Sequence, residues 1–492
     1  MSPAVSHTKR QLVSGTIQIF LAEALLLPTG IITSGFLTRN LGPEGYGLFT
    51  LVASLMSWIG WTVTSAFTRT TIKFVGEAED WRPIGTKVLQ LHLLAGCGFT
   101  TLIWLLADPI AAFLNEPATA NYLRLFSLDI PLFCLGYVHR SILVGTGGFT
   151  QRAITTAGRW IARLLLIVAL VAMGLSIEGA ILGSLGASLV ELLLSRFYIR
   201  PTLFSPSSFP IGKLWGYAVP LFMLSMSLRL YEKLDLFALQ IFGGTAAQVG
   251  FYGAAQNLAL IPGMFTLAFS PLLLSTLTRT LFKEDLAAAK NMSREAMRAI
   301  LLMIPFASLM AGSATQIVTL IFGNTFLETA SFLSVLIFGA ISLAMISVTT
   351  SILTAAGKPN WTFALVGPLV PIAIVGHWVL IPRIGSIGAA WVSSAVATLG
   401  ALATVYAVYV YWKIIPSFST LLRSVGLSLI FYTLASSWSS EGILLLLQLS
   451  VLAALIPLGF LTLGEFNSHE LGIAQRKFSA VAEFIFGRGW SN

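Results

Sequence analysis

The sequence predicts an all-α membrane protein with about 14 transmembrane helices. Apolar residues make up 56% of the 492-residue chain and charged residues only 10%, whereas soluble domains carry roughly 25% charged residues. The apolar residues form long runs, each close to the roughly 20 residues that a spanning helix needs. Spanning strands are not expected, because an open sheet edge in lipid would leave backbone groups unpaired.

The apolar runs give the predicted spans in chain order. These spans are 12–38, 46–68, 84–107, 121–145, 157–175, 178–198, 214–242, 250–276, 296–322, 326–356, 360–380, 385–412, 420–438 and 442–463. The 43 glycines spread through the chain suit close packing of helices in lipid. The first run follows Lys9 and Arg10 and is too long for the apolar part of a signal peptide, so we expect a retained signal-anchor helix.

The positive charges indicate the orientation of the chain. The formal net charge is +9, and most lysines and arginines fall in alternate gaps between spans, as the positive-inside rule predicts for cytosolic loops. These loop cations include Arg140, Arg152, Arg159 and Arg163. We therefore expect both termini in the cytosol and the chain in the inner (plasma) membrane. A nucleic-acid partner is not expected, because no solvated basic domain is present.

Two motifs recur roughly 200–210 residues apart, which indicates an internal duplication. Residues 41–47 (LGPEGYG) correspond to 249–253 (VGFYG), and residues 175–181 correspond to 384–390. An even number of spans separates the copies, so both halves have the same orientation, as in parallel-repeat transporters. The predicted domains are a six-helix bundle 1–205, a second six-helix bundle 206–415, two additional helices 416–463 and a cytosolic tail 464–492.

One predicted span, 214–242, carries four charged residues in an otherwise apolar run: Arg229, Glu232, Lys233 and Asp235. Each would cost roughly 2.5–3.5 kcal/mol at the centre of a lipid-facing helix. On a helix the four fall within one arc of about 160°, so all can face a wet cavity or protein. In one interpretation Arg229 and Lys233 bind phosphate oxygens while the acids tune them. In the other, the four charges form a self-paired network that fixes helix packing.

Two six-span halves that each carry a tyrosine–glycine motif after the first span resemble the MOP superfamily of exporters. The matching residues are 39–48 (RNLGPEGYGL) in the first half, and Asp235 with 249–255 (VGFYGAA) in the second. Over residues 12–412 the chain is similar to the polysaccharide-biosynthesis flippases of the O-antigen type. The resemblance implies a central cavity with cationic walls that opens alternately to each side. It also favours a structural role for Asp235, which matches the family pattern near the outer end of its span.

Three more charged residues are candidates for the site or its support. If the first and seventh spans both line the cavity, as the resemblance implies, Glu23 could pair with Arg229 or Lys233, or carry a proton. Arg39 ends the first span on the outer side, where it could meet phosphate or extend to lipid head groups. Asp129 lies in a proline-broken span, where local hydrogen bonding is favoured over substrate contact.

The resemblance implies a transporter, not an enzyme, that moves isoprenoid-diphosphate-linked oligosaccharide from the cytosolic to the outer leaflet. No phosphate-binding loop is present and neither the cysteines nor the histidines show metal-ligand spacing, so we expect no cofactor and no metal. Two alternatives are a cation-coupled multidrug exporter of the same superfamily and a membrane glycosyltransferase or polymerase. The expected partners are the lipid-linked substrate and membrane lipids, with polysaccharide assembly enzymes as candidates, and we expect a monomer.

Overall fold

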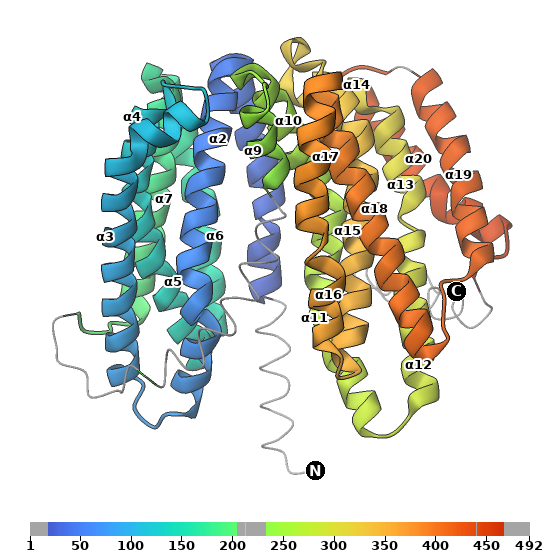
Figure 1. Cartoon of the computed structure of the whole chain (residues 1–492), viewed down its shortest axis with the longest axis horizontal. Helices are drawn as coiled ribbons and strands as arrows, with labels where there is room; N and C mark the ends of the chain where they lie inside the picture. The colour runs from blue at the N-terminus through green and yellow to red at the C-terminus, as the bar shows by residue number, and fades with distance from the viewer. Residues whose placement is uncertain (1–17, 204–211, 213–232, 439, 467–492) are drawn as a thin grey trace, which may run out of the picture.

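The computed structural model describes residues 18–203, 212, 233–438 and 440–466, and this part of the chain is built of helices without strands (Figure 1). The all-α fold class is therefore confirmed. In the described ranges, ten helical stretches are long and apolar enough to cross a membrane. Two of these, Gln18–Glu77 and Phe149–Tyr198, each contain two predicted spans. The total of about 14 stays a prediction, because the predicted span 214–242 lies mostly outside the described residues.

The N-terminal helices pack together on one side of the molecule, blue to teal in Figure 1. They are α2 (Leu26–Glu77), α3 (Arg82–Phe113), α4 (Thr119–Ser127), α5 (Asp129–Gly145), α6 (Phe149–Leu170), the π-helix η1 (Val171–Leu175) and α7 (Ser176–Tyr198). The closest pairings are α6 with α7, α2 with α5, and α3 with α5. These pairings bring α2, α5, α6 and α7 around a common interior, which contains the candidate site.

Two backbone breaks divide the long N-terminal helices. In α2, Gly42 has a φ of 67°, a left-handed conformation that favours glycine, and Pro43 follows it without an N–H to continue the helix. Between α6 and α7, Gly174 and Ser176 have φ values of 91° and 49°. Each break lies where the sequence predicts the end of one span and the start of the next.

The remaining helices form the other side of the molecule, green to red in Figure 1. They are α9 (Leu234–Ile241), α10 (Ala246–Ala259), α11 (Ile261–Phe282), α12 (Leu286–Leu301), α13 (Ile304–Gly312), α14 (Ala314–Phe322), the 3₁₀-helix η2 (Asn324–Phe326), α15 (Thr329–Ala355), α16 (Pro359–Val366), α17 (Leu369–Ile384), α18 (Ser386–Trp412), α19 (Phe418–Ser437) and α20 (Ile443–Thr462). Here α15 packs against α11 and α18, while α19 packs against α13 and α20. The division into four domains stays a prediction.

The two sides meet where α2 packs against α10, and this contact joins the two copies of the recurring motif. A Cβ atom added at Gly47 would lie 1.7 Å from the carbonyl oxygen of Ala246, and one at Gly250 would lie 2.3 Å from that of Pro43. The backbones therefore approach more closely than any side chain permits, which is the use of small residues at helix contacts in membranes. Asn257 on α10 also donates a hydrogen bond to the Tyr46 hydroxyl of α2 (2.9 Å).

The α19–α20 pair is fastened to α12 by the carboxylate of Glu465, which follows α20. Its Oε1 accepts hydrogen bonds from Arg298 Nε on α12 (2.7 Å) and Thr420 Oγ1 on α19 (2.5 Å), and its Oε2 from Arg423 Nη1 (2.6 Å). Burial alone would raise the pKa of this carboxyl group, but the hydrogen bonds from Thr420, Arg423 and Arg298 outweigh burial and hold the pKa below its usual value.

Replacing Glu465 by glutamine is expected to lower the free energy of unfolding by about 1.5–3 kcal/mol, the range for hydrogen bonds to charged groups. Because the folded pKa is depressed, this stabilisation is complete above the unfolded pKa of roughly 4.3 and is lost as the pH falls through the folded pKa. Thermal unfolding in detergent at pH 7 should show the loss, with Glu441→Gln in the exposed α19–α20 loop as the control. Equal melting temperatures for Glu465→Gln and wild type at pH 7 would contradict this expectation.

Candidate functional site

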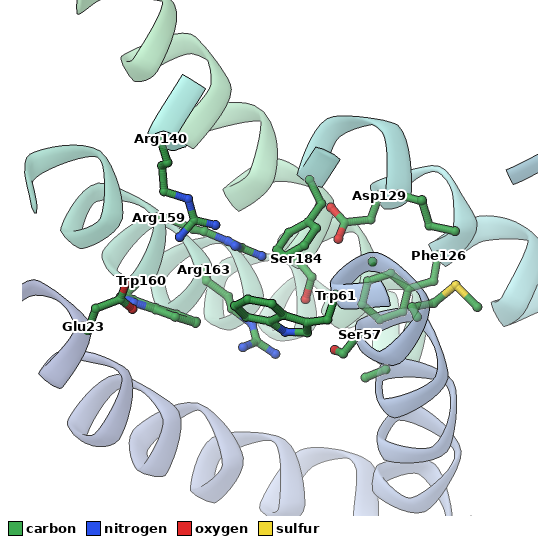
Figure 2. Close-up of a pocket in the computed structure, with 15 residues that line it drawn as sticks. Glu23, Ser57, Trp61, Phe126, Asp129, Arg140, Arg159, Trp160, Arg163 and Ser184 are labelled. Atoms are coloured by element: carbon green, nitrogen blue, oxygen red, sulfur yellow. The ribbon is translucent and has the colours of Figure 1, made fainter. Parts of the chain in front are cut away.

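A cavity of about 130 Å³ lies among α2, α4, α5, α6, α7 and the helical segment before α2 (Figure 2). Its walls combine cationic, acidic and aromatic side chains. The lining residues are Glu23, Ala53, Met56, Ser57, Gly60, Trp61, Phe126, Asp129, Ile130, Phe133, Arg140, Arg159, Trp160, Arg163 and Ser184. All of them belong to the N-terminal group of helices.

Most of the cations come from a single face of α6. Arg152, Arg159 and Arg163 are separated by seven and four residues, so they lie in one row along the helix. Arg140 is contributed by α5 and faces the same region (Figure 2). The sequence interpretation assigns these four arginines to the cytosolic gaps between spans, and in the structure all four belong to the helices α5 and α6.

A buried carboxylate connects the two arginine-bearing helices. Glu191 on α7 is fully buried, with Oε1 lying 2.8 Å from Arg140 Nε and Oε2 3.3 Å from Arg159 Nη1. Opposite charges at this distance and depth attract strongly and offset part of the desolvation of each ion. The Glu191 carboxylate thereby brings two guanidinium groups from different helices into one cluster.

Aromatic rings pack against the planar faces of the same two guanidinium groups. The Arg140 guanidinium carbon lies 4.3 Å from the centre of the Tyr137 ring, and that of Arg159 lies 4.7 Å from the Phe133 ring. Trp61 on α2 contacts both rings, with centroid separations of 5.8 Å to Phe133 and 5.2 Å to Tyr137. These cation–π contacts fix the planes of the guanidinium groups while leaving their edges available for hydrogen bonds.

The two acidic lining residues differ in their contacts. Glu23 Oε1 lies 3.0 Å from Arg152 Nη2, so its partner among the described residues is Arg152 and not the predicted Lys233. Asp129, at the start of α5, lies on the wall opposite Arg140 and Arg159 in Figure 2, and its buried Oδ1 has no hydrogen-bond partner within the described residues. The local hydrogen-bonding role of Asp129 stays a prediction.

Several buried N–H groups around the cavity lack a protein acceptor in the described part of the chain. They are Arg140 Nε and Nη2, Arg159 Nε, Arg163 Nε and Trp160 Nε1, of which Arg140 Nε lies at ion-pair distance from Glu191. Within the same ranges, no carboxylate oxygen lies at ion-pair distance from Arg163. An unsatisfied buried donor costs roughly 1–3 kcal/mol, and more when it is charged. The cavity is therefore chemically suited to an anion that accepts several hydrogen bonds.

The predicted cluster of the seventh span is only partly described. Arg229 and Glu232 lie outside the described residues. Lys233 Nζ donates to Gln256 Oε1 (3.3 Å). Asp235, which is buried, accepts hydrogen bonds from Tyr252 Oη (2.8 Å), Gln256 Nε2 (2.9 Å) and a serine of α18, Ser393 Oγ (3.0 Å). These contacts tie α9 to α10 and α18. The structural role of Asp235 stays a prediction.

Arg39 makes a contact that differs from both predicted ones, which were with phosphate and with lipid head groups. Its Nη2 donates to the carbonyl oxygen of Leu320 (2.7 Å) and its Nε to that of Ile321 (3.3 Å). Both carbonyls belong to the last turn of α14, where helix carbonyl groups lack internal partners. Arg39 therefore joins α2 to the other side of the molecule. A role for Arg39 in substrate binding stays a prediction.

Sequence reasoning missed Arg140, Arg152, Arg159, Arg163 and Glu191 as site residues. A usable signal was present for the arginines of α6, because a row of three cations at seven- and four-residue spacing is unexpected on one face of a spanning helix. The signal for Glu191 was its position as an acidic residue in the apolar span 178–198. Arg140 gave no comparable signal, because it lies near the end of its predicted span.

Comparison with known proteins gives the following similarities. Residues 36–331 match the model of a family described as polysaccharide biosynthesis protein. A protein of Shigella flexneri named "Putative O-antigen transporter" is 24% identical over 388 residues, which cover 74% of this chain and 90% of that protein. The solved structure of the lipid II flippase MurJ in an inward closed conformation has a TM-score of 0.74 at 16% identity, covering 92% of this chain and 98% of that chain. An inward-facing multidrug resistance MATE family transporter of the MOP superfamily has a TM-score of 0.59 at 15% identity, covering 84% and 95%. The two structures share the fold of this chain.

Proposed function

The chain belongs to the polysaccharide biosynthesis protein family, and from this premise we propose that it is a flippase for isoprenoid-diphosphate-linked oligosaccharide. The family match confirms the resemblance predicted from the sequence. The proposed direction of transport is from the cytosolic to the outer leaflet of the inner membrane, with both termini in the cytosol. The relative named as an O-antigen transporter supports the substrate class, because its substrate also belongs to polysaccharide assembly.

The single observation that carries the proposal is the arginine-lined cavity. A diphosphate offers many acceptor oxygens and negative charge, and the guanidinium groups of Arg140, Arg159 and Arg163 offer N–H groups that have no acceptor among the described residues. The volume of about 130 Å³ accommodates a small anionic group and not a whole oligosaccharide. We therefore assign the cavity to the diphosphate, with the glycan and the isoprenoid chain held elsewhere.

Alternating access would bring this cavity to each side of the membrane in turn. The contact of α2 with α10, formed through Gly47 and Gly250, closes one end of the space between the two groups of helices. Transport requires that this contact separates, as expected for the rocking of two repeats about a binding site. Because the motif ends the first span of each half, the positive-inside orientation assigns this contact to the outer side.

The rival function is the cation-coupled export of cationic drugs that the sequence left open, and a structure named as a multidrug resistance MATE family transporter shares the fold of this chain. A cationic substrate would meet a cavity in which the lining arginines Arg140, Arg159 and Arg163 outnumber the lining acids Glu23 and Asp129. The charge balance of the site therefore favours an anionic substrate.

Reconstitution into liposomes distinguishes the two functions. The purified chain is expected to move a fluorescent undecaprenyl-diphosphate sugar between leaflets, detected by enzymatic or chemical modification of the glycan exposed outside. The same vesicles are expected to show no transport of ethidium above empty liposomes. Transport of ethidium without movement of the lipid-linked sugar would overturn the proposal in favour of the drug exporter.

A further inference from the structure

The fully buried Glu191 has no surface on the cavity, yet its carboxylate contacts two of the arginines that line it. We infer that Glu191 is a positioning residue for anion binding, holding Arg140 and Arg159 in a paired arrangement that directs their free N–H groups to one ligand. The inference rests on the proposed function, because it assumes that the cavity receives a diphosphate. It adds a residue that acts on the substrate only through other residues.

Each of the two arginines has one nitrogen close to Glu191 and another that has no acceptor within the described residues. A guanidinium has five N–H bonds. Arg140 Nε lies 2.8 Å from Glu191 Oε1 and Arg159 Nη1 lies 3.3 Å from Glu191 Oε2, which are ion-pair distances, although Arg140 Nε forms no hydrogen bond within the described residues. The buried Arg140 Nη2 and Arg159 Nε then keep no acceptor within the described residues. Glu191 is therefore the ion-pair partner of both guanidinium groups, and Arg140 Nη2 and Arg159 Nε are left for an anion.

The rings of Tyr137 and Phe133 complete this arrangement by covering guanidinium faces. With a ring at the face and a carboxylate at one edge, each guanidinium has few alternative orientations. Binding then costs less ordering of long side chains, which is the general benefit of preorganisation. Two guanidinium groups held this close would also repel each other without a carboxylate between them.

Charge alone predicts the opposite effect of removing Glu191, and this difference makes the inference testable. Replacing Glu191 by glutamine makes the site more positive, so a purely electrostatic role would strengthen the binding of an anion. A positioning role predicts weaker binding, because the neutral amide presents one oxygen to two arginines and turns an NH₂ group toward the other. The sign of the change therefore separates the two roles.

The experiment measures binding of farnesyl diphosphate and farnesyl monophosphate to the full-length protein in detergent, by isothermal titration calorimetry. Glu191→Gln is expected to raise the Kd for the diphosphate at least tenfold and to reduce the preference for diphosphate over monophosphate. Glu178→Gln, an exposed residue of the same helix α7, is the matched control and should leave both unchanged. Equal or tighter diphosphate binding by Glu191→Gln would overturn the inference.

A second variant covers the case in which Glu191→Gln does not fold. Glu191→Asp keeps the charge but shortens the side chain, so it cannot span both arginines and should also weaken diphosphate binding and lower the preference. Wild-type affinity and preference in Glu191→Asp would contradict the positioning role. If instead the wild type does not bind farnesyl diphosphate, or Arg163→Ala binds it normally, the proposed function of the cavity fails as well. Normal binding by the Glu191 variants beside lost binding by Arg163→Ala would overturn only the positioning role.

Discussion

Arg163→Ala is expected to reduce the translocation of undecaprenyl-diphosphate sugar in proteoliposomes by about 10- to 100-fold. Arg163 lines the cavity and no carboxylate oxygen in the described ranges lies within 4.0 Å of its nitrogens, so its N–H groups are available to the substrate. Loss of one charge-assisted contact costs roughly 1.5–3 kcal/mol, and each 1.4 kcal/mol corresponds to a tenfold change. Initial rates of sugar modification outside the vesicles, corrected for the amount of reconstituted protein, give the effect.

Two further variants make the Arg163 experiment specific. Arg163→Lys keeps the charge but loses the planar fork, so an intermediate rate is expected. Arg294→Ala removes an exposed arginine on α12, outside the cavity, and should transport at the wild-type rate. Wild-type transport by Arg163→Ala would show that the diphosphate does not bind in this cavity. In the same assay, Arg229→Ala and Lys233→Ala test the site that the sequence predicts in the seventh span.

Gly47→Ala is expected to abolish transport while leaving the individual helices folded. The added methyl group would lie 1.7 Å from the carbonyl oxygen of Ala246, and a backbone atom cannot move aside as a flexible side chain can. The contact between α2 and α10 must therefore separate, and the protein should remain open at this end. A transporter that cannot close one end cannot complete alternating access, so transport should fall by more than tenfold.

Distances between spin labels measure this opening directly. Labels at the exposed positions Asn115, between α3 and α4, and Glu328, before α15, report the separation of the two sides at the motif end. Gly47→Ala should lengthen this distance relative to wild type. Gly30→Ala is the matched control on the same helix, because a Cβ atom there meets nothing within 4 Å. An unchanged distance in Gly47→Ala would contradict the role assigned to the α2–α10 contact.

Much of the fold could be predicted because a lipid bilayer restricts the backbone conformations that a spanning chain can adopt. Long apolar runs must be helical, and breaks such as the one at Gly42 and Pro43 follow from local backbone chemistry. The two copies of the tyrosine–glycine motif could be found in the sequence, but their direct contact through Gly47 and Gly250 could not. That contact depends on how two helices far apart in the chain pack against each other.

Only part of the candidate site could be predicted from the sequence. Glu23 was identified because a carboxylate in an apolar run is costly, and the structure indeed places it at a cavity. Its partner was not identified, because Arg152 had been counted with the loop cations and the choice of partner depends on tertiary packing. The positive-inside rule treats each cation near a span end as a loop residue, so it concealed the arginines that line the cavity.

A structure of the protein bound to an isoprenyl diphosphate, determined by cryo-electron microscopy in nanodiscs, tests the central claim most directly. The account predicts phosphate density inside the N-terminal group of helices, with oxygens at hydrogen-bond distance from the guanidinium groups of Arg159 and Arg163. Phosphate density beside Lys233, or between lipid and the outer surface of the helices, would contradict it.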